Sequence, residues 1–304
     1  MYHYHPDQRE KQTRRASGHH SDCVCCCAGT ASRARGFTLV ELLMAMSISA
    51  ILVMALAGIV TATQSAWRHT QGIEDSQAEI NASFDRMRLM ISQAGIYQVN
   101  GQAPEVGLAV VTRAWNYIDV PDILVVWSGG RNGGISQNGT LNRLPRMNEI
   151  LIYTSDPADA HQFVEIALPD SSAEIDFNSS AFDNTIRTAI QSSQAEKALL
   201  SKRLKNSQYL LSGSPWGPTA SNLIFTITRT PDDASLQATT PGTSDWMNLP
   251  WPQGTVSATS GLRQVTVNYE IQFETAEQNT LTDINSETAL PFFGSSSRLY
   301  AYTP

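Results

Sequence analysis

The chain has 304 residues, of which 41% are hydrophobic and 16% are charged, a composition typical of globular proteins rather than disordered chains. Residues 1–36 hold six of the 21 Lys and Arg and three of the 28 Asp and Glu, so residues 37–304 keep 15 basic against 25 acidic side chains. An acidic body argues against nucleic acid as a partner, because neutralising phosphates requires clustered Lys and Arg.

The first 36 residues also contain all four cysteines and four of the six histidines. Thiolate and imidazole are the ligands that zinc prefers, but three adjacent cysteines close a tetrahedral site poorly. The alternatives are a disordered cytoplasmic leader with reduced thiols, or a translation start later than Met1. Residues 37–304 lack cysteine, so they form no disulfide. The cysteines and histidines of residues 1–36 are Cys23, Cys25, Cys26, Cys27, His3, His5, His19 and His20.

An apolar segment follows this leader. Leu42 to Val60 are uncharged, and at 1.5 Å per residue they form a helix of roughly 28 Å, close to the hydrocarbon thickness of a bilayer. Arg33 and Arg35 precede the segment and mixed charges follow it. The positive-inside rule therefore predicts a cytoplasmic N-terminus and a body on the other side of the membrane.

Three interpretations of this segment compete: a secretory signal peptide cleaved near Ala57, a plain single-span anchor, and a prepilin segment. Glu41 discriminates among them. A carboxylate at the bilayer centre costs roughly 2.5–3.5 kcal/mol on insertion scales, and neither a signal peptide nor an anchor gains from that cost.

The stretch RGFTLVELL, residues 35–43, resembles the processing motif of type IV prepilins and of type II secretion pseudopilins. The resemblance implies that prepilin peptidase cuts after Gly36 and that Phe37 becomes the N-methylated first residue. It also implies that Glu41, the acidic fifth residue of the processed chain, pairs with the N-terminal amine of a neighbouring subunit during filament assembly. A leader of 36 residues is longer than most leaders in this family.

Beyond the membrane, apolar residues recur at steps of three and four, the pattern of an amphipathic helix. No proline occurs between Phe37 and Gly95, so we expect one helix over residues 37–95, with a membrane part to residue 63 and an amphipathic part over 64–95. Gly95 is the expected C-cap. The stripe comprises Ile73, Ile80, Phe84, Met87, Ile91 and Ala94.

The remaining sequence predicts strands, because its apolar runs are rich in β-branched and aromatic residues and are bounded by turn residues. The expected strands are 122–127, 149–154, 162–168, 222–229 and 263–274. In the last of these Val265, Val267, Tyr269, Ile271 and Phe273 share one face, as in an antiparallel sheet. Residues 181–206 contain neither Gly nor Pro and predict a helix, whereas 129–148, whose SGGRNGG run indicates a hairpin tip, and 231–261 are expected to be surface loops.

We therefore expect an α+β fold of the pilin type, with a long N-terminal helix packed on an antiparallel β-sheet head, residues 96–304. The size of this head favours a minor subunit that resembles the J-type pseudopilins or the W-type minor pilins. By this resemblance residues 1–36 are a cytoplasmic leader, the helix is anchored in the inner membrane, and the head is periplasmic. The expected partners are prepilin peptidase, other pilin subunits, the inner-membrane assembly platform and lipid.

The residues offer little for catalysis, so we expect neither an enzyme nor a cofactor or metal site. Residues 37–304 contain only His69 and His161, both expected to be exposed, and no phosphate loop or nucleophile elbow. Asp232 and Asp233 are adjacent in a loop, and paired carboxylates catalyse only when the fold opposes them across a substrate. The resemblance leaves calcium binding open, because some pseudopilins bind calcium through loop carboxylates, although no EF-hand pattern occurs here. Three tryptophans, Trp216, Trp246 and Trp251, lie in proline-containing loops. They either form a surface that binds a partner, or two of them pack under a long loop. The competing function is a secreted binding or catalytic domain.

Overall fold

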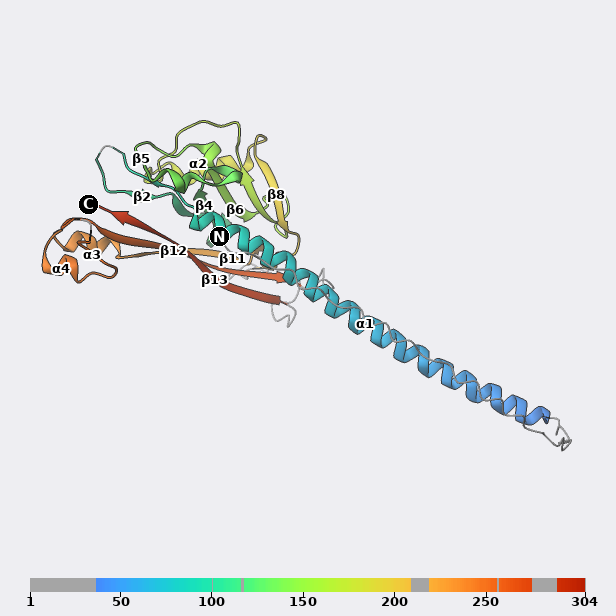
Figure 1. Cartoon of the computed structure of the whole chain (residues 1–304). Helices are drawn as coiled ribbons and strands as arrows, with labels where there is room; N and C mark the ends of the chain where they lie inside the picture. Colours follow the sequence, from blue (N-terminus) through green and yellow to red (C-terminus); the bar gives the residue numbers. More distant parts are fainter. Residues whose placement is uncertain are drawn as a thin grey trace, which may run out of the picture. The chain divides into compact units, whose positions relative to one another are not determined.

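The computed structural model describes residues 37–99, 101–115, 118–208, 219–255, 257–274 and 289–303. Figure 1 labels its helices and strands. By its internal contacts the chain divides into two units, one ending at Ile59 and the other beginning at Val60.

Helix α1 runs from Leu39 to Ser92 without interruption. It ends three residues before the predicted C-cap, and Gly95 serves another purpose. The amide of Gly95 donates to the carbonyl of Trp127 at 2.7 Å, and a Cβ at this position would lie 2.6 Å from the Trp127 ring. The expectation of a C-cap at Gly95 is therefore wrong, because this glycine is needed for close approach to the indole rather than for helix termination.

The larger sheet is antiparallel and has the order β3-β4-β6-β7-β8. Three of its strands were predicted, β4, β6 and β7, whereas β3 and β8 were not. Its strands are β3 (Leu108–Trp115), β4 (Ile118–Trp127), β6 (Ile150–Ser155), β7 (Phe163–Ala167) and β8 (Glu196–Ser201).

A second antiparallel sheet has the order β11-β12-β13, formed by β11 (Leu223–Thr230), β12 (Gly261–Glu274) and β13 (Ala289–Tyr302). The alternation predicted for β12 is confirmed, since Val265, Val267, Tyr269, Ile271 and Phe273 are all buried. Together with the long N-terminal helix, these sheets confirm the α+β, pilin-like fold.

Short elements complete the head. There are two small sheets, β2-β1-β5 and β10-β9, and several short helices. Their bounds are β1 (Ile96–Tyr97), β2 (Glu105–Val106), β5 (Thr140–Leu141), β9 (Asn206–Gln208), β10 (Thr219–Ser221), α2 (Phe182–Gln191), α3 (Asp233–Ala238), α4 (Ser244–Met247), η1 (Gly130–Asn132), η2 (Ile135–Asn138) and η3 (Met147–Glu149).

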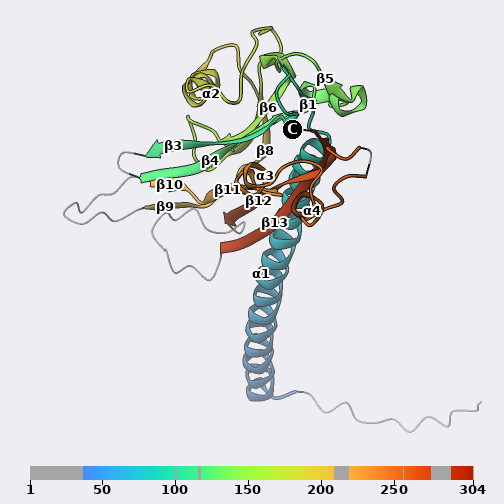
Figure 2. The ribbon, with the colours of Figure 1, turned by 90° about the vertical axis from the view of Figure 1, so that its left-hand side faces the viewer.

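Two apolar clusters form the core of the head. In the first, the α1 residues Ile80, Phe84, Met87 and Ile91 pack with side chains from both larger sheets. In the second, α2 packs on the opposite face of the five-stranded sheet, as Figure 2 shows. The predicted stripe of α1 is thus a core face, which is why it is apolar at helical spacing.

The strand β13 also holds the end of α1 by hydrogen bonds. The hydroxyl of Ser296 donates to the carbonyl of Arg88 at 3.2 Å, and the Arg298 guanidinium donates to the carbonyl of Ser92 at 3.1 Å. The carbonyl of Ser92 is one of the last four of the helix, which lack an intrahelical donor, so the bond from Arg298 satisfies it. The ring of Phe292 adds an apolar contact, with its centroid 5.5 Å from that of Phe84.

Two predictions for the connecting segments need correction. The helix expected over 181–206 ends at Gln191, and residues 196–201 form β8 instead, because pairing with the open edge of β7 outweighs a modest helix propensity. The expected surface loops contribute to the core, since Ile135, Met147, Leu236 and Trp246 are buried. The SGGRNGG run forms 3-10 turns within the connection from β4 to β6, with left-handed glycines at 129, 130, 133 and 134.

Candidate assembly site

The N-terminus of α1 is closed by a pair of residues that cap each other. The backbone amide and the hydroxyl of Thr38 both donate to Oε2 of Glu41, each at 2.9 Å. In return, the amide of Glu41 donates to the Thr38 hydroxyl at 3.3 Å. This is a capping box, which satisfies two amides that have no intrahelical acceptor.

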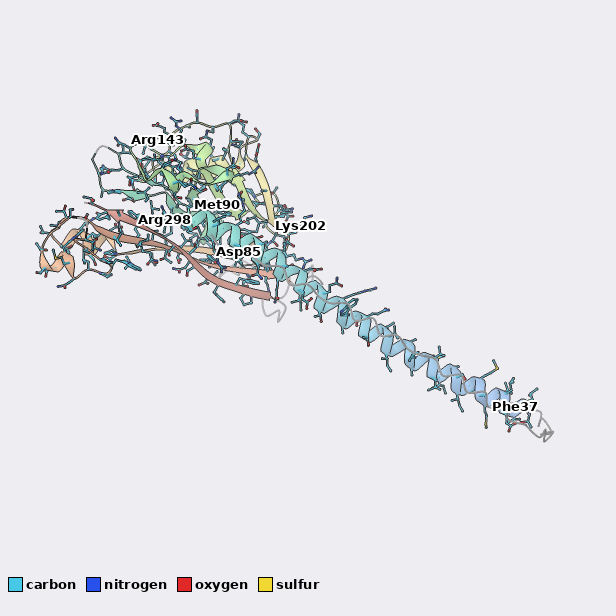
Figure 3. The ribbon with its side chains drawn as sticks, in the orientation of Figure 1. Phe37, Asp85, Met90, Arg143, Lys202 and Arg298 are labelled. Atoms are coloured by element: carbon cyan, nitrogen blue, oxygen red, sulfur yellow. The ribbon has the colours of Figure 1, made fainter. Side chains whose placement is uncertain are left out.

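The capping box explains how one chain tolerates a carboxylate at this position. Glu41 has donors within its own chain, and all of them use Oε2. Among the described residues, Oε1 of Glu41 accepts no hydrogen bond, so the carboxylate can take a further donor. Phe37 lies next to this box at the start of α1 (Figure 3) and its side chain is 83% exposed. Gly36 lies outside the described residues.

The apolar segment of α1 displays its side chains in all directions. Its large hydrophobic residues, from Phe37 to Val60, are each at least 46% exposed, and the mean hydropathy of its most apolar window is 2.5. Its polar groups are satisfied within the helix, as where the Ser47 hydroxyl donates to the carbonyl of Leu43 at 2.8 Å. α1 is thus long and apolar enough to cross a membrane, and it needs no water along this stretch.

In the head, α1 is fixed to the five-stranded sheet by an ion pair between the half-buried Arg86 and a buried carboxylate. Both Nε and Nη2 of Arg86 donate to the carboxylate of Glu165 on β7, each at 2.8 Å. The Tyr153 hydroxyl donates to the same carboxylate at 2.9 Å, and Glu165 is 1% exposed. Two residues further along α1, on another side of the helix, Nε of Arg88 donates to the Tyr269 hydroxyl of the other sheet at 2.6 Å. Together these bonds set the rotation of α1 about its axis.

The acidic pair that the sequence singles out has structural partners. Asp232 accepts from the amide of Ser235 at 2.6 Å and so caps α3. Asp233 lies 2.5 Å from Arg263 and 3.1 Å from Arg229. Burial would raise the pKa of Asp233, but hydrogen bonds and charge from these two arginines outweigh it and lower that pKa. Asp232 thus acts as a helix cap and Asp233 as an ion-pair partner.

The histidines and tryptophans are placed as follows. Nδ1 of the half-buried His161 lies 3.2 Å from the carbonyl of Leu204, so the expectation of full exposure is wrong for this residue.

Trp246 is fully buried and stacks with Tyr302, whereas Trp251 is 42% exposed, so these two residues do not form one exposed surface. Trp216 and the side chain of His69 lie outside what the structure describes. The described residues contain no group of three or more His, Cys, Asp or Glu that could hold a metal ion.

Comparison with known proteins identifies the N-terminal segment alone. Residues 31–60 match the family described as the prokaryotic N-terminal methylation motif. No curated protein and no solved structure matched the chain. The matched residues include the capping box and most of the apolar part of α1, and the match ends where the second unit begins.

Proposed function

We propose that this chain, whose residues 31–60 match the prokaryotic N-terminal methylation motif, is a minor subunit of a type IV pilus or of a type II secretion pseudopilus. One observation carries the proposal: the motif over residues 31–60 leads into an apolar helix whose side chains are exposed all round. Such a helix must be covered by lipid before assembly and by other subunits afterwards. The proposed role is structural rather than catalytic.

Processing is the first step of this role. Prepilin peptidase removes residues 1–36 by cutting between Gly36 and Phe37, and the new amine of Phe37 is methylated. Residues 37–63 then anchor the chain in the inner membrane, residues 64–95 continue the helix, and residues 96–304 form a periplasmic head. Arg33 and Arg35 support a cytoplasmic N-terminus by the positive-inside rule.

Assembly is the second step. At the membrane, the inner-membrane platform brings the apolar helix against other subunits, and the carboxylate of Glu41 pairs with the amine of a neighbour. The support is that Oε2 of Glu41 is held by Thr38 while Oε1 has no hydrogen bond among the described residues. A pair of opposite charges in the filament lowers the cost of the buried carboxylate.

The N-terminus of the mature chain tests the proposal. Mass spectrometry of protein purified from membranes should find Phe37 as the first residue, carrying one methyl group. A Gly36→Ala variant should keep residues 1–36, because the cut requires glycine in this family. A mature chain that starts at Gly58 would instead establish a secretory signal peptide, and unmodified processing of Gly36→Ala would contradict cleavage by prepilin peptidase.

A further inference from the structure

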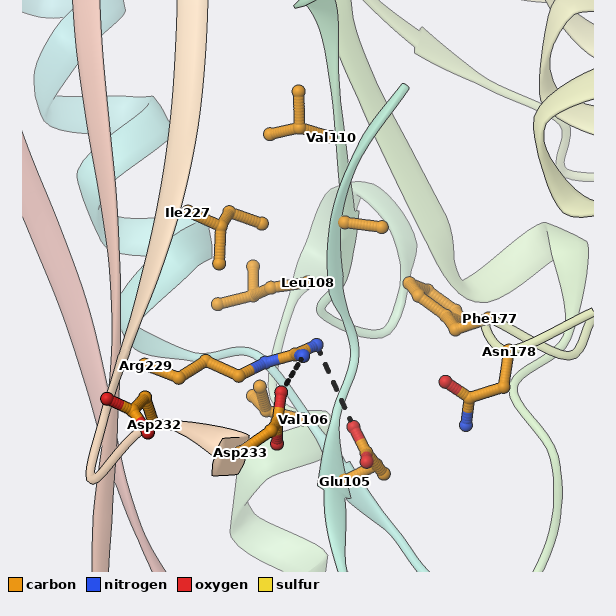
Figure 4. Close-up of a pocket in the computed structure, with 11 residues that line it drawn as sticks. Glu105, Val106, Leu108, Val110, Phe177, Asn178, Ile227, Arg229, Asp232 and Asp233 are labelled. Atoms are coloured by element: carbon orange, nitrogen blue, oxygen red, sulfur yellow. Dashed lines mark hydrogen bonds and ion pairs between the residues drawn. The ribbon is translucent and has the colours of Figure 1, made fainter. Parts of the chain in front are cut away.

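The head contains a cleft between β3 of the larger sheet and β11 of the smaller one. Its volume is about 410 Å³, and Figure 4 shows the side chains around it. Leu108, Val110 and Ile227 form an apolar wall, and a charged wall contains Arg229 with Glu105. Leu108, Ala109 and Val110, three consecutive residues of β3, line the cleft. Because side chains alternate between the two faces of a strand, residues from both faces reach the cleft only if the edge of β3 faces it.

A smaller polar pocket of about 160 Å³ adjoins this cleft, with Glu105 and Asn178 in the walls of both. Tyr97 also lines the pocket and is only 4% exposed. Among the described residues, its hydroxyl has no hydrogen-bond partner, which is rare for a buried polar group. The Tyr97 ring is held in place by aromatic contacts, with centroids 5.8 Å from Trp127 and 6.0 Å from Phe177.

The charges around the two hollows favour a cation. Carboxylates outnumber guanidinium groups, since the walls contain Glu105, Asp176, Asp232 and Asp233 but only Arg229. That arginine is shared, because its guanidinium lies 3.9 Å from Glu105 and 3.1 Å from Asp233. Within the walls, the guanidinium nearest to Glu105 is therefore a distant one that Glu105 shares with Asp233.

The titration of these groups agrees with this view. Burial raises the pKa of Glu105, although the charges of Arg229 and Arg263 oppose the rise. Burial also raises the pKa of Tyr97, and the charges of Glu105 and Asp176 add to that effect. The tyrosine is thus a neutral hydroxyl beside two carboxylates, and a bound cation would relieve the poor solvation of Glu105.

We propose that the cleft and the polar pocket bind a lysine side chain of another subunit, together with the apolar residue beside it. The ammonium group would donate to the Tyr97 hydroxyl and to the carboxylates of Glu105 and Asp176. The neighbouring apolar side chain would cover the partly buried Val110 and Ile227, with the partner segment extended along the edge of β3. The inference rests on the proposed function only for the source of the lysine, another filament subunit.

An ammonium ion suits the pocket better than the alternatives. Lysine presents a compact charge with three donors, which fits a hollow of about 160 Å³. A metal ion is a poorer fit, because the described residues contain no group of three or more His, Cys, Asp or Glu that could hold one. An anion would face the excess of carboxylates.

Titration with n-butylammonium tests the pocket in the processed, full-length chain in detergent. The reporter is the ¹⁹F resonance of 5-fluorotryptophan at Trp127, next to Tyr97. We expect a saturable shift with n-butylammonium and none with butyrate, n-butanol or calcium chloride. A response to n-butanol equal to that of the ammonium would reduce the site to an apolar hollow, and a response to calcium alone would make it a metal site; either overturns the proposal.

Two variants separate binding from folding. Tyr97→Phe and Glu105→Gln should each weaken n-butylammonium binding at least fivefold. Tyr97→Phe should leave the thermal midpoint unchanged, because the hydroxyl has no partner inside the head. The matched control is Glu196→Gln, an exposed carboxylate in an ion pair with Arg131, which should bind as the parent does. Unchanged binding by both pocket variants would overturn the proposal.

The source of the lysine is tested in assembled filaments. A carbodiimide joins carboxylates to amines in direct contact, so we expect an amide between Glu105 or Asp176 and a lysine of another subunit, located by mass spectrometry. Glu105→Gln combined with Asp176→Asn should abolish it. If filaments contain the methylated subunit but no such amide forms, the cleft inference fails while the proposed function stands.

Discussion

At the scale of single residues, Thr38 and Glu41 reconcile two opposing requirements. Under the proposed function, the chain holds a carboxylate in an apolar segment before assembly, and that carboxylate still has to accept a donor afterwards. The capping box meets both requirements by using only Oε2 of Glu41 among the described residues. Thr38 therefore positions Glu41, a role that the charge pattern of the sequence does not reveal.

Substitution of Thr38 separates this positioning from helix formation. Thr38→Val keeps the shape of the side chain and removes the hydroxyl, whereas Thr38→Ser keeps the hydroxyl. Loss of a helix N-cap costs about 1 kcal/mol, which corresponds to roughly a fivefold decrease in the equilibrium that depends on it. We expect filament incorporation, measured by immunoblotting of sheared fractions, to fall about fivefold in Thr38→Val and further in Glu41→Gln.

Membrane insertion should stay normal in all three variants, and Thr38→Ser should assemble like the parent chain. Parent-like incorporation of Thr38→Val would show that Glu41 needs no positioning by its own chain. Parent-like incorporation of Glu41→Gln would refute the pairing with a neighbouring amine.

At the scale of elements, α1 is coupled to the larger sheet by one ion pair. Glu165 lies on the central part of β7 and is almost fully buried, so its charge depends on Arg86 for compensation. Removing one partner of a buried pair leaves an uncompensated charge, which costs far more than the pair itself contributes.

Arg86→Ala should therefore destabilise the head by about 3–5 kcal/mol, a fall of roughly 6–20 °C in the thermal midpoint followed by circular dichroism. The double variant Arg86→Met, Glu165→Gln should recover part of this loss, because it removes both charges. Arg68→Ala, an exposed position of the same helix, serves as the control and should leave the midpoint unchanged. A midpoint for Arg86→Ala within 1 °C of the control would disprove the coupling.

The elements also show where sequence patterns suffice. The stripe of α1 and the alternation of β12 were predictable, because each has one buried face and one wet face over many residues. β8 was missed because EKALLS has helix-forming residues and becomes a strand only through its pairing with β7. β13 was missed since its SSS run lacks apolar alternation.

The candidate sites divide in the same way. Glu41 was identifiable as a charge in an apolar segment, which is a local signal. Tyr97, Glu105 and Asp176 meet only through the fold, since Tyr97 and Glu105 belong to paired short strands and Asp176 comes from a distant segment. Gly95 gives a local signal that misleads. A glycine after a helix predicts a C-cap, whereas in the structure this position lacks a side chain so that the Trp127 ring can pack against it.

At the scale of the whole molecule, carboxylates make the head sensitive to acid. Burial would raise the pKa of Glu149, but hydrogen bonds from Arg143, Trp127 and the amide of Arg146 outweigh it and lower that pKa below its ordinary value of 4.5. A carboxyl group whose pKa is lowered by folding stabilises the folded state at pH values above its ordinary pKa. This stability is lost as the pH falls through the pKa of the folded state. Asp156 behaves likewise, whereas the raised pKa of Glu105 acts in the opposite direction.

Glu149→Gln should therefore cost about 1.5–3 kcal/mol at pH 7, from the loss of hydrogen bonds to a charged acceptor. The difference in thermal midpoint between this variant and the parent should shrink as the pH falls below 4.5, the ordinary pKa of the group. Glu196→Gln breaks an exposed ion pair worth 0–1 kcal/mol and is the control. A difference between Glu149→Gln and the parent that stays constant from pH 7 to pH 3 would contradict a lowered pKa.

The bonds from Ser296 and Arg298 to the end of α1 have a consequence for biosynthesis. The apolar stripe of α1 is made early, but β12 begins about 170 residues later, which at roughly 5–20 residues per second is a delay of about 10–30 s. During that time the rings that pack on Phe84 from β12 and β13, those of Tyr269, Phe273 and Phe292, do not yet exist. The stripe of a nascent chain therefore lacks these neighbours until β12 and β13 are made, and under the proposed function a chaperone or the membrane surface would cover it.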